Sequence, residues 1–202
     1  MTDAAPELQI AEEDALRADL YDFLSALLSG PPDKSMLSRA AGLSGDDSAL
    51  GQAVATMARI ARATNEKAVE REFNALFIGL SRGELMPYAS YYLTGFLNEK
   101  PLAALRGDMA ALRITRAPNV YEPEDNIASL LEMMAGMIRG RFGDPVPVAR
   151  QKDFFFKHIA PWAEHFFSDL EVAQNSVLYA PVGTVGKAFL DIETQAFRMG
   201  AE

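Results

Sequence analysis

The residues of this sequence best suited to chemistry are four carboxylates in the stretch NVYEPEDNIASLLEMMAGMIRGRFG: Glu122, Glu124, Asp125 and Glu132. Clustered carboxylates can bind a metal ion, transfer protons, or accept hydrogen bonds from arginine, whose planar guanidinium matches a carboxylate with two parallel bonds. The first two roles usually need further ligands or a partner base. The rest of the sequence must therefore show whether such partners exist.

Metal and nucleophile chemistry lack the residues they require. The chain contains no cysteine, which excludes thiolate nucleophiles, disulfides and cysteine-ligated metals. The two histidines, His158 and His165, are seven residues apart, or about 10 Å along a helix, which is too far for one shared metal ion. There is no Glu-x-x-His pair of the di-iron type and no G-x-S-x-G elbow. We expect no catalytic residue, no metal site and no cofactor.

A glycine-rich segment, GTVGKA at residues 183–188, resembles a phosphate-binding loop only superficially. The Walker pattern needs four residues between its glycines and a Ser or Thr after the lysine. Here two residues separate the glycines, and an alanine follows the lysine. The segment is therefore not expected to bind phosphate.

The carboxylate stretch also has the pattern of a helix start. Pro123 suits a first helical position, and Glu124 and Asp125 would complement the positive end of the helix dipole. Apolar residues then recur at helical spacing until Gly140 and Gly143: Ile127, Leu130, Leu131, Met134, Met137 and Ile138. The sequence predicts a helix that begins at Pro123.

The composition is that of a globular protein, with 202 residues that are 49% hydrophobic and 23% charged. The net charge of −9 disfavours a nucleic-acid partner, because nucleic-acid binders usually present a basic face, and it suits a basic partner. No apolar run approaches the roughly 18 residues that span a bilayer, and the acidic N-terminus lacks a secretory signal pattern. We expect a cytoplasmic protein without stable membrane insertion.

Helical periodicity dominates the chain. Apolar residues at helical spacing, capping residues such as Asn65 and Gly/Pro stops predict helices over these approximate ranges: 16–27, 33–41, 46–63, 65–79, 101–112, 123–139, 148–170 and 185–198. The predicted fold class is all-α.

The best linker candidate is TRAPNVYEP, because Pro118 and Pro123 each push the preceding residue out of helical conformation. We predict a single helical domain with two lobes joined near residues 115–125: an N-terminal lobe over about 8–114, a linker at 115–122 and a C-terminal lobe at 123–202. Such a linker permits a monomer or a lobe-exchanged dimer.

Three blocks of this sequence carry a family resemblance. YEPEDN before IASLLEMMAGMI resembles a Glu-Pro-x-Asp-His signature, EFNALFIGL before MPYASYYL resembles a Leu-Phe segment with a Pro-aromatic-x-Ser loop, and HIAPWAEHFF resembles a His-Leu-x-x-Trp helix. These are signatures of the TorD/DmsD/NarJ group of redox-enzyme maturation chaperones. The blocks follow the expected order and cover residues 21–170.

The resemblance implies an all-helical, two-part fold with the EPED region at the junction. Members of this group bind the N-terminal twin-arginine leader, or a related N-terminal segment, of a molybdopterin-containing oxidoreductase. They hold its catalytic subunit for cofactor loading and delay export until folding is complete. They are chaperones rather than enzymes. The implied partners are therefore that subunit and its leader peptide.

The resemblance also implies a peptide-binding site. Glu122 and Asp125 would accept the leader arginines, and adaptable aromatic and methionine side chains would line an apolar groove, with Tyr92, Met133, Met134 and Met137 as further candidates. Asn126 replaces the signature histidine, which keeps hydrogen bonding but removes titration near neutral pH. The predicted site residues are Leu76, Phe77, Pro87, Tyr88, Ser90, Tyr91, Glu122, Pro123, Asp125 and Asn126.

Two other classes of function stay open at this point. One is a helical nucleotide- or cofactor-binding protein, or an enzyme, that reuses the same scaffold. The other is an interaction protein without leader specificity. Saturable nucleotide binding without peptide would indicate the first, and partners whose N-termini lack paired arginines would indicate the second.

Overall fold

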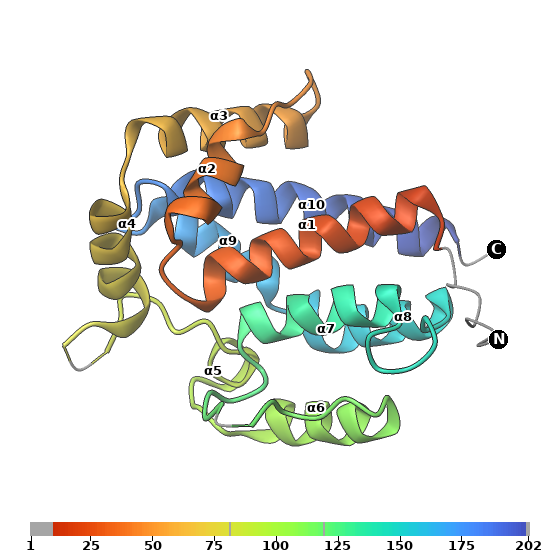
Figure 1. Ribbon diagram of the computed structural model, residues 1–202. Coiled ribbons are helices and arrows are strands. Elements are labelled where there is room, and N and C mark those ends of the chain that lie inside the picture. Colours follow the sequence, from red (N-terminus) through yellow and green to blue (C-terminus); the bar gives the residue numbers. More distant parts are fainter. Residues whose placement is uncertain (1–9, 81, 119, 201–202) are drawn as a thin grey trace, which may run out of the picture.

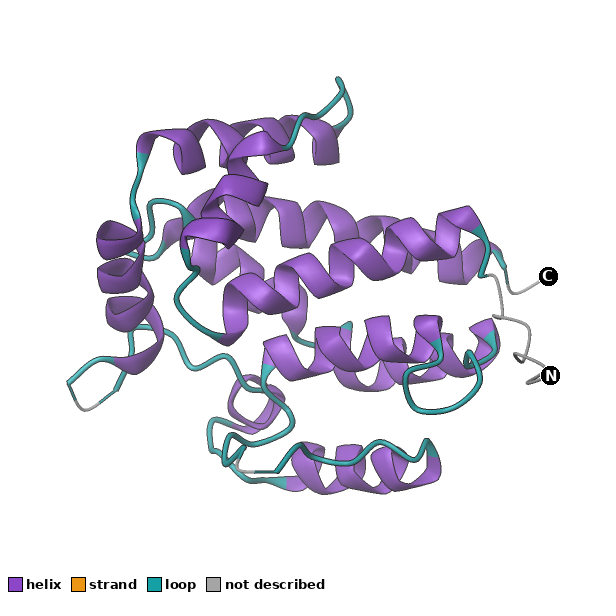
Figure 2. Ribbon diagram, in the orientation of Figure 1, coloured by secondary structure: helices purple, strands orange, loops and turns teal. Residues whose placement is uncertain are grey.

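The computed structural model describes residues 10–80, 82–118 and 120–200, and within them every regular element is a helix (Figure 1; Figure 2). The all-α prediction is confirmed. In chain order the elements are α1 Glu12–Ser29, α2 Lys34–Gly42, α3 Ala49–Ala63, α4 Glu66–Phe73, the short π-helix η1 Asn74–Ile78, α5 Ala89–Thr94, α6 Lys100–Ala111, α7 Ile127–Arg139, α8 Val148–Phe154, the short π-helix η2 Phe155–Ile159, α9 Ala163–Val172 and α10 Tyr179–Met199. None of the helices in these ranges combines the length and hydropathy needed to cross a bilayer.

Short polar side chains start three of the early helices. The side chain of Asp33 accepts a hydrogen bond from Met36 N–H at 2.8 Å, and Ser48 Oγ accepts one from Gly51 N–H at 3.0 Å. Asn65 Oδ1 accepts the Ala68 N–H at 3.1 Å, as predicted for an N-cap. Each cap satisfies an amide that has no partner within its helix.

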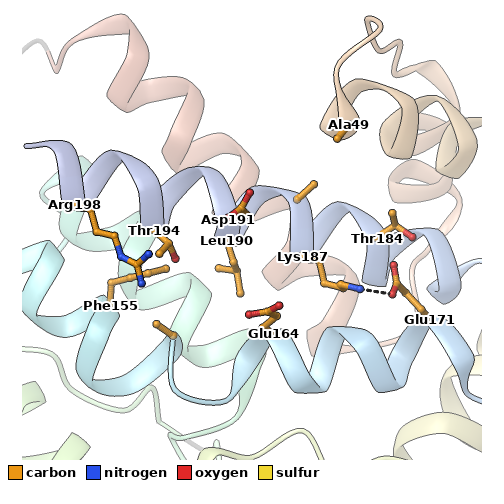
Figure 3. Close-up of a pocket in the computed structure, with 12 residues that line it drawn as sticks. Ala49, Phe155, Glu164, Glu171, Thr184, Lys187, Leu190, Asp191, Thr194 and Arg198 are labelled. Carbon is orange, nitrogen blue, oxygen red and sulfur yellow. Dashed lines mark hydrogen bonds and ion pairs between the residues drawn. The ribbon is translucent and has the colours of Figure 1, made fainter.

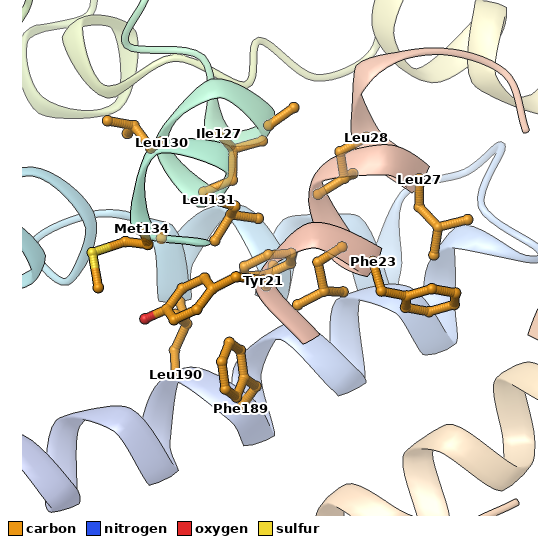
Figure 4. Packing of buried hydrophobic residues seen from close by; sticks show 14 of the residues in the cluster. Tyr21, Phe23, Leu27, Leu28, Ile127, Leu130, Leu131, Met134, Phe189 and Leu190 are labelled. Atoms are coloured by element: carbon orange, nitrogen blue, oxygen red, sulfur yellow. The ribbon is translucent and has the colours of Figure 1, made fainter. Parts of the chain in front are cut away.

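Helix α1 forms the centre of the hydrophobic core. It packs most extensively against α7, and Tyr21, Leu24 and Leu27 on α1 are fully buried (Figure 4). Leu16, the first residue of the helix predicted over 16–27, is 63% exposed, so the buried face begins only after the first turn of α1.

Helices from both sides of residues 115–122 share one hydrophobic cluster. Helix α1 contacts α7 across that segment, and α3 likewise packs against α10 (Figure 1). The structure is therefore a single domain with a continuous core. A division into lobes that can exchange between chains stays a prediction.

The prediction of one helix over 148–170 is wrong, because the structure divides these residues into three segments. Helix α8 continues directly into the short π-helix η2, and α9 begins only at Ala163. Pro161 lacks the N–H that a continuing helix would use, and Trp162 after it leaves the helical conformation, with φ −144° and ψ −26°. His158 and His165 consequently lie on different elements.

Helix α10 begins at Tyr179, six residues before the expected start, and the GTVGKA segment lies inside it. Its glycines allow close packing on α9. A Cβ at Gly186 would lie 2.4 Å from Phe167 Cε1, and one at Gly183 would lie 2.6 Å from the Phe167 carbonyl oxygen. The segment is thus a helix–helix contact, which agrees with its rejection as a phosphate loop.

A buried ion pair joins the first and last helices. The Arg17 guanidinium donates from Nε to Glu193 Oε1 and from Nη2 to Oε2, both at 2.8 Å, and Tyr21 Oη donates to Oε2 at 2.9 Å. Glu193 is 1% exposed. Asp14 also accepts from Arg17 at 2.6 Å. The pair fixes α1 against α10.

Replacing Glu193 should destabilise the fold. In Glu193→Ala the half-buried Arg17 loses its bidentate partner, and we expect unfolding free energy to fall by about 3 kcal/mol in urea titration. Asp191→Ala, which removes an exposed carboxylate from the same helix, should change it by less than about 0.5 kcal/mol. Equal losses in the two variants would contradict a structural role for the pair.

Candidate functional site

Two loops that are far apart in the sequence lie side by side where α5 and α7 begin. Tyr88 and Asn126 form an isolated antiparallel bridge. The Ala89 N–H donates to the Asp125 carbonyl at 3.0 Å, and the Ile127 N–H donates to the Pro87 carbonyl at 2.9 Å. The structure therefore joins the MPYAS loop to the EPED loop, two of the three blocks that carried the resemblance.

Asp125 holds this junction from inside. It is 1% exposed, and its Oδ2 accepts the Ser90 N–H at 2.7 Å in the first turn of α5. Ser90 is fully buried, and within the described part of the chain Ser90 Oγ and Asp125 Oδ1 have no hydrogen-bond partner. The Asp125 carboxylate is thus closed to solvent in this conformation and acts as a cap for α5.

The helix after EPED begins later than we predicted. Helix α7 starts at Ile127, so Pro123 is not its first residue. Asn126 is the N-cap: its backbone is extended, and its Oδ1 accepts the Ala128 N–H at 2.9 Å. Pro123, Glu124 and Asp125 lie in the preceding turn, because asparagine caps helices well and the bridge with Tyr88 holds residue 126 in extended form.

Glu122 occupies the exposed side of the same junction. Its carboxylate accepts a hydrogen bond from the phenol of Tyr88. Partial burial and this neighbouring carboxylate both raise the pKa of Tyr88 well above its usual value. Glu122 itself is exposed, as is Tyr121 beside it, at 85%.

Glu124 is the most strongly paired carboxylate of the four. Arg106 of α6 lies 2.9 Å from Glu124 Oε2, and Arg116 of the linker lies 2.8 Å from it. Burial acts to raise the pKa of Glu124, but the hydrogen bonds from Arg116 and Arg106 outweigh it and lower the pKa to about 2. Our sequence interpretation missed these pairs, because nothing in the local pattern places residue 106 beside residue 124.

The remaining predicted site residues separate by exposure. Leu76 and Pro87 are buried with Ser90, Asp125 and Asn126, whereas Phe77, Tyr88, Tyr91 and Pro123 are partly exposed. Phe77 packs edge-on against Tyr179, with ring centroids 5.5 Å apart. The buried members build the junction, and only the others present a surface.

The additional candidates Tyr92, Met133, Met134 and Met137 divide in the same way. Met134 and Met137 are fully buried in the core. Tyr92 is partly exposed and donates from Oη to Asp169 at 2.9 Å. Met133 lines a cavity together with Glu122, Glu124 and Glu132, so it alone among these methionines adjoins the carboxylate cluster.

A small cavity lies between the linker, α6 and α7. Its volume is about 140 Å³, with apolar walls from Met109, Ile114, Val120 and Met133. The carboxylates among its lining residues are Glu122, Glu124 and Glu132. Three of the four carboxylates between residues 119 and 143 thus line one cavity, and the fourth, Asp125, is buried.

A larger groove of about 470 Å³ follows α9 and α10 (Figure 3). Lys187 pairs with Glu171 at 2.8 Å across it. The charged residues among its lining are three acids, Glu164, Glu171 and Asp191, against two bases, Lys187 and Arg198. This balance does not favour an anionic ligand such as a nucleotide. Among the residues that the structure describes, no three His, Asp or Glu side chains are grouped to hold a metal ion.

His158 connects α6 to the aromatic helices. Its Nε2 lies 2.6 Å from Asp108 Oδ2, and Lys157 lies 2.6 Å from the same oxygen. Trp162 Nε1 donates to the His158 carbonyl at 2.8 Å. Burial lowers the pKa of His158, although Asp108 opposes that change. These contacts attach α6, and with it Arg106, to the core.

Residues 44–168 match the family described as "Nitrate reductase delta subunit". The match covers more than half of the chain. The chain belongs to this family. The matched residues contain all three blocks that carried the resemblance, which confirms the family that they indicated.

Curated relatives support this membership. "Chaperone protein TorD" of Vibrio cholerae serotype O1, strain El Tor Inaba N16961, is 26% identical over 204 residues, covering 91% of this chain and 92% of the relative. The protein of the same name from strain O395 is 28% identical over 126 residues, covering 59% of this chain and 57% of that protein. Its counterpart in Aliivibrio salmonicida is 26% identical over 132 residues, and 61% of each protein is covered.

The fold also has a solved counterpart. A crystal structure titled as a putative redox enzyme maturation protein from Archaeoglobus fulgidus superposes with a TM-score of 0.54 at 19% identity, covering 94% of this chain and 99% of that one. The likeness shows the fold alone. The curated relatives are named as chaperones, in agreement with the prediction that this family member is not an enzyme.

Asp125 and Glu122 should differ sharply in their effect on stability. Asp125→Ala leaves the buried Ser90 N–H without a partner, and we expect the unfolding free energy to fall by about 2 kcal/mol. Glu122→Ala removes an exposed carboxylate and should cost less than about 0.5 kcal/mol. Urea denaturation followed by circular dichroism measures both. A larger loss in Glu122→Ala would mean that the exposed bond with Tyr88 holds the junction instead.

Stability should fall as the solution is acidified below the ordinary pKa of histidine. Because burial lowers the pKa of His158 in the folded state, the unfolded chain binds more protons between about 6.5 and that lower value, and acid favours unfolding there. His158→Gln should flatten the dependence of melting temperature on pH between about 7.5 and 5. His165→Gln, at an exposed position, should leave it unchanged; the opposite pattern would exclude His158 as the source.

Proposed function

We propose that this chain is a maturation chaperone that binds the N-terminal leader of a redox enzyme. The client is the catalytic subunit of a molybdopterin-containing oxidoreductase with a twin-arginine leader. Binding takes place in the cytoplasm, where the chaperone holds the apo subunit until its cofactor is loaded and delays export. Family membership and the chaperone names of the relatives support the maturation role.

One observation carries the proposal: the junction of the α5 and α7 loops presents an acidic and aromatic surface on a rigid base. The base is held by the hydrogen bond from the buried Ser90 N–H to the Asp125 carboxylate. Glu122 and the partly exposed Tyr88 face outward, and Tyr91 lies one turn further along α5. A leader offers the complementary chemistry, with guanidinium groups for the carboxylate and apolar side chains for the aromatic rings.

Exposed apolar residues extend this surface along α5 and its C-terminal turn. Leu93 is 45% exposed and Phe96 is 70% exposed, and Tyr121 adjoins Glu122 on the opposite loop. Large exposed apolar side chains cost solubility unless a partner covers them, so they suit a peptide site. The net charge of −9 would also speed the encounter with a basic leader.

The client can be identified directly from cells. The tagged protein, recovered from its own cell's cytosol, should carry the unprocessed catalytic subunit of a molybdopterin-containing oxidoreductase, identified by mass spectrometry. A variant with Tyr88→Ala and Glu122→Gln should recover much less of it. Recovery of only proteins without paired N-terminal arginines would contradict the leader-binding function and favour a general interaction protein.

Glu122→Gln should weaken leader binding without weakening the fold. Loss of a charge-assisted hydrogen bond of about 1.4 kcal/mol corresponds to about a tenfold increase in Kd for a twin-arginine peptide, measured by isothermal titration calorimetry. Glu70→Gln, an exposed carboxylate on α4, is the control with the same change in charge. If both variants bind equally well while the unmodified protein binds the peptide, Glu122 does not contact the leader.

A further inference from the structure

Glu124 already holds two guanidinium groups that belong to the chain itself. Arg116 donates a hydrogen bond from Nε to Oε1 at 3.1 Å, and its Nη2 forms an ion pair with Oε2 at 2.8 Å. Arg106 donates from Nε and Nη2 to Oε2, at 3.1 Å and 2.9 Å. One carboxylate therefore binds a pair of arginines, each through two guanidinium nitrogens that lie within 3.1 Å of its oxygens.

The surroundings of Glu124 would also suit the apolar part of a leader peptide. Its side chain is 11% exposed and lines the cavity whose apolar walls include Met109 and Met133. Ile114, the residue immediately before the linker, lines the same cavity and is 6% exposed. Residues 114–116 thus place an apolar side chain in the cavity and an arginine on the carboxylate, which are the two groups that a leader would offer.

We propose that Glu124 is the carboxylate that selects arginine in the leader, and that Arg116 and Arg106 occupy it in the free protein in place of the leader arginines. This inference rests on the proposed function and adds a specificity-determining residue to it. A bound leader exchanges its guanidinium groups for those of the chain, and the linker moves away from the cavity as Arg116 leaves.

The contacts of the linker allow this exchange. Arg106 and Arg116 are 52% and 33% exposed, so both guanidinium groups can turn into solvent when those of the leader take their place on Glu124. Among the described residues between 115 and 122, the only backbone hydrogen bond joins Val120 N–H to the Ala117 carbonyl, within the linker itself. The linker segment that moves away from the cavity ends at Glu122, whose carboxylate accepts the hydrogen bond from Tyr88.

The other carboxylates at this site are less suited to reading two arginines. Asp125 is buried, and its Oδ2 is committed to a backbone amide of α5. Glu122 accepts from a neutral phenol and stands further out. Glu124 alone among the three holds charged donors that a second pair of guanidiniums can replace without leaving a buried charge unpaired.

Two synthetic peptides test the inference, each with an apolar stretch after either Arg-Arg or Lys-Lys. Fluorescence anisotropy measures their affinity for the full chain. Arg116→Ala should bind the Arg-Arg peptide about fivefold more tightly, because the internal competitor is gone. Arg113→Ala, which removes an exposed positive charge three residues earlier, should stay within about twofold of the unmodified protein and controls for net charge. Glu124→Gln should lose most of the preference for Arg-Arg over Lys-Lys.

A second measurement needs no variant and so does not depend on Glu124→Gln folding. Hydrogen exchange of the linker amides around residues 115–122 should accelerate when the Arg-Arg peptide binds and should not do so with the Lys-Lys peptide. This readout follows the release of the linker itself, which a purely structural role for Glu124 would not produce.

The outcomes separate the two proposals. If the unmodified protein binds the Arg-Arg peptide, but Arg116→Ala gains nothing and the linker exchange is unchanged, the inference about Glu124 is overturned and leader binding stands. If neither the unmodified protein nor Arg116→Ala binds either peptide, both are overturned. Tighter binding by Arg116→Ala with faster linker exchange in the unmodified protein supports both.

Discussion

The burial of α1 against α7 and α10 is the constraint on which the rest of this structure depends. Tyr21 and its neighbours bring the apolar face of α7 under α1, while Arg17 fixes the same helix to Glu193. Because α7 follows the EPED loop directly, its position in the core sets the position of that loop. The candidate site is therefore held by the most deeply buried part of the molecule, although its own surface is exposed.

Under the proposed function, the junction of the two loops is the surface that recognises the leader. A single bridge and a few hydrogen bonds align residues 87–90 with 125–127, and Asp125 closes the contact from below. A preorganised site of this kind binds a flexible leader with less loss of entropy on the protein side. The proposed exchange at Glu124 would move the linker, whose described residues make few backbone hydrogen bonds.

The three acids of the EPED segment have three different roles, although they belong to one sequence motif. Asp125 is a buried cap, Glu122 is an exposed acceptor beside Tyr88, and Glu124 binds the arginines of the chain itself. Their alternation follows from the turn before α7, which points successive side chains in different directions. A substitution in this segment should therefore change stability, binding or specificity according to the residue it replaces.

The sequence by itself determined the all-α class, the cap at Asn65 and the family, because helical periodicity, capping side chains and ordered motifs are local properties. It misplaced the start of α7 and missed the break at Pro161, since helix ends depend on competing caps and on neighbours outside the segment. Only the tertiary structure decided that Asp125 is buried and that Arg106 reaches Glu124. Those facts depend on how α6 and α7 pack against a shared core, and no local pattern encodes a contact between helices that are distant in the chain.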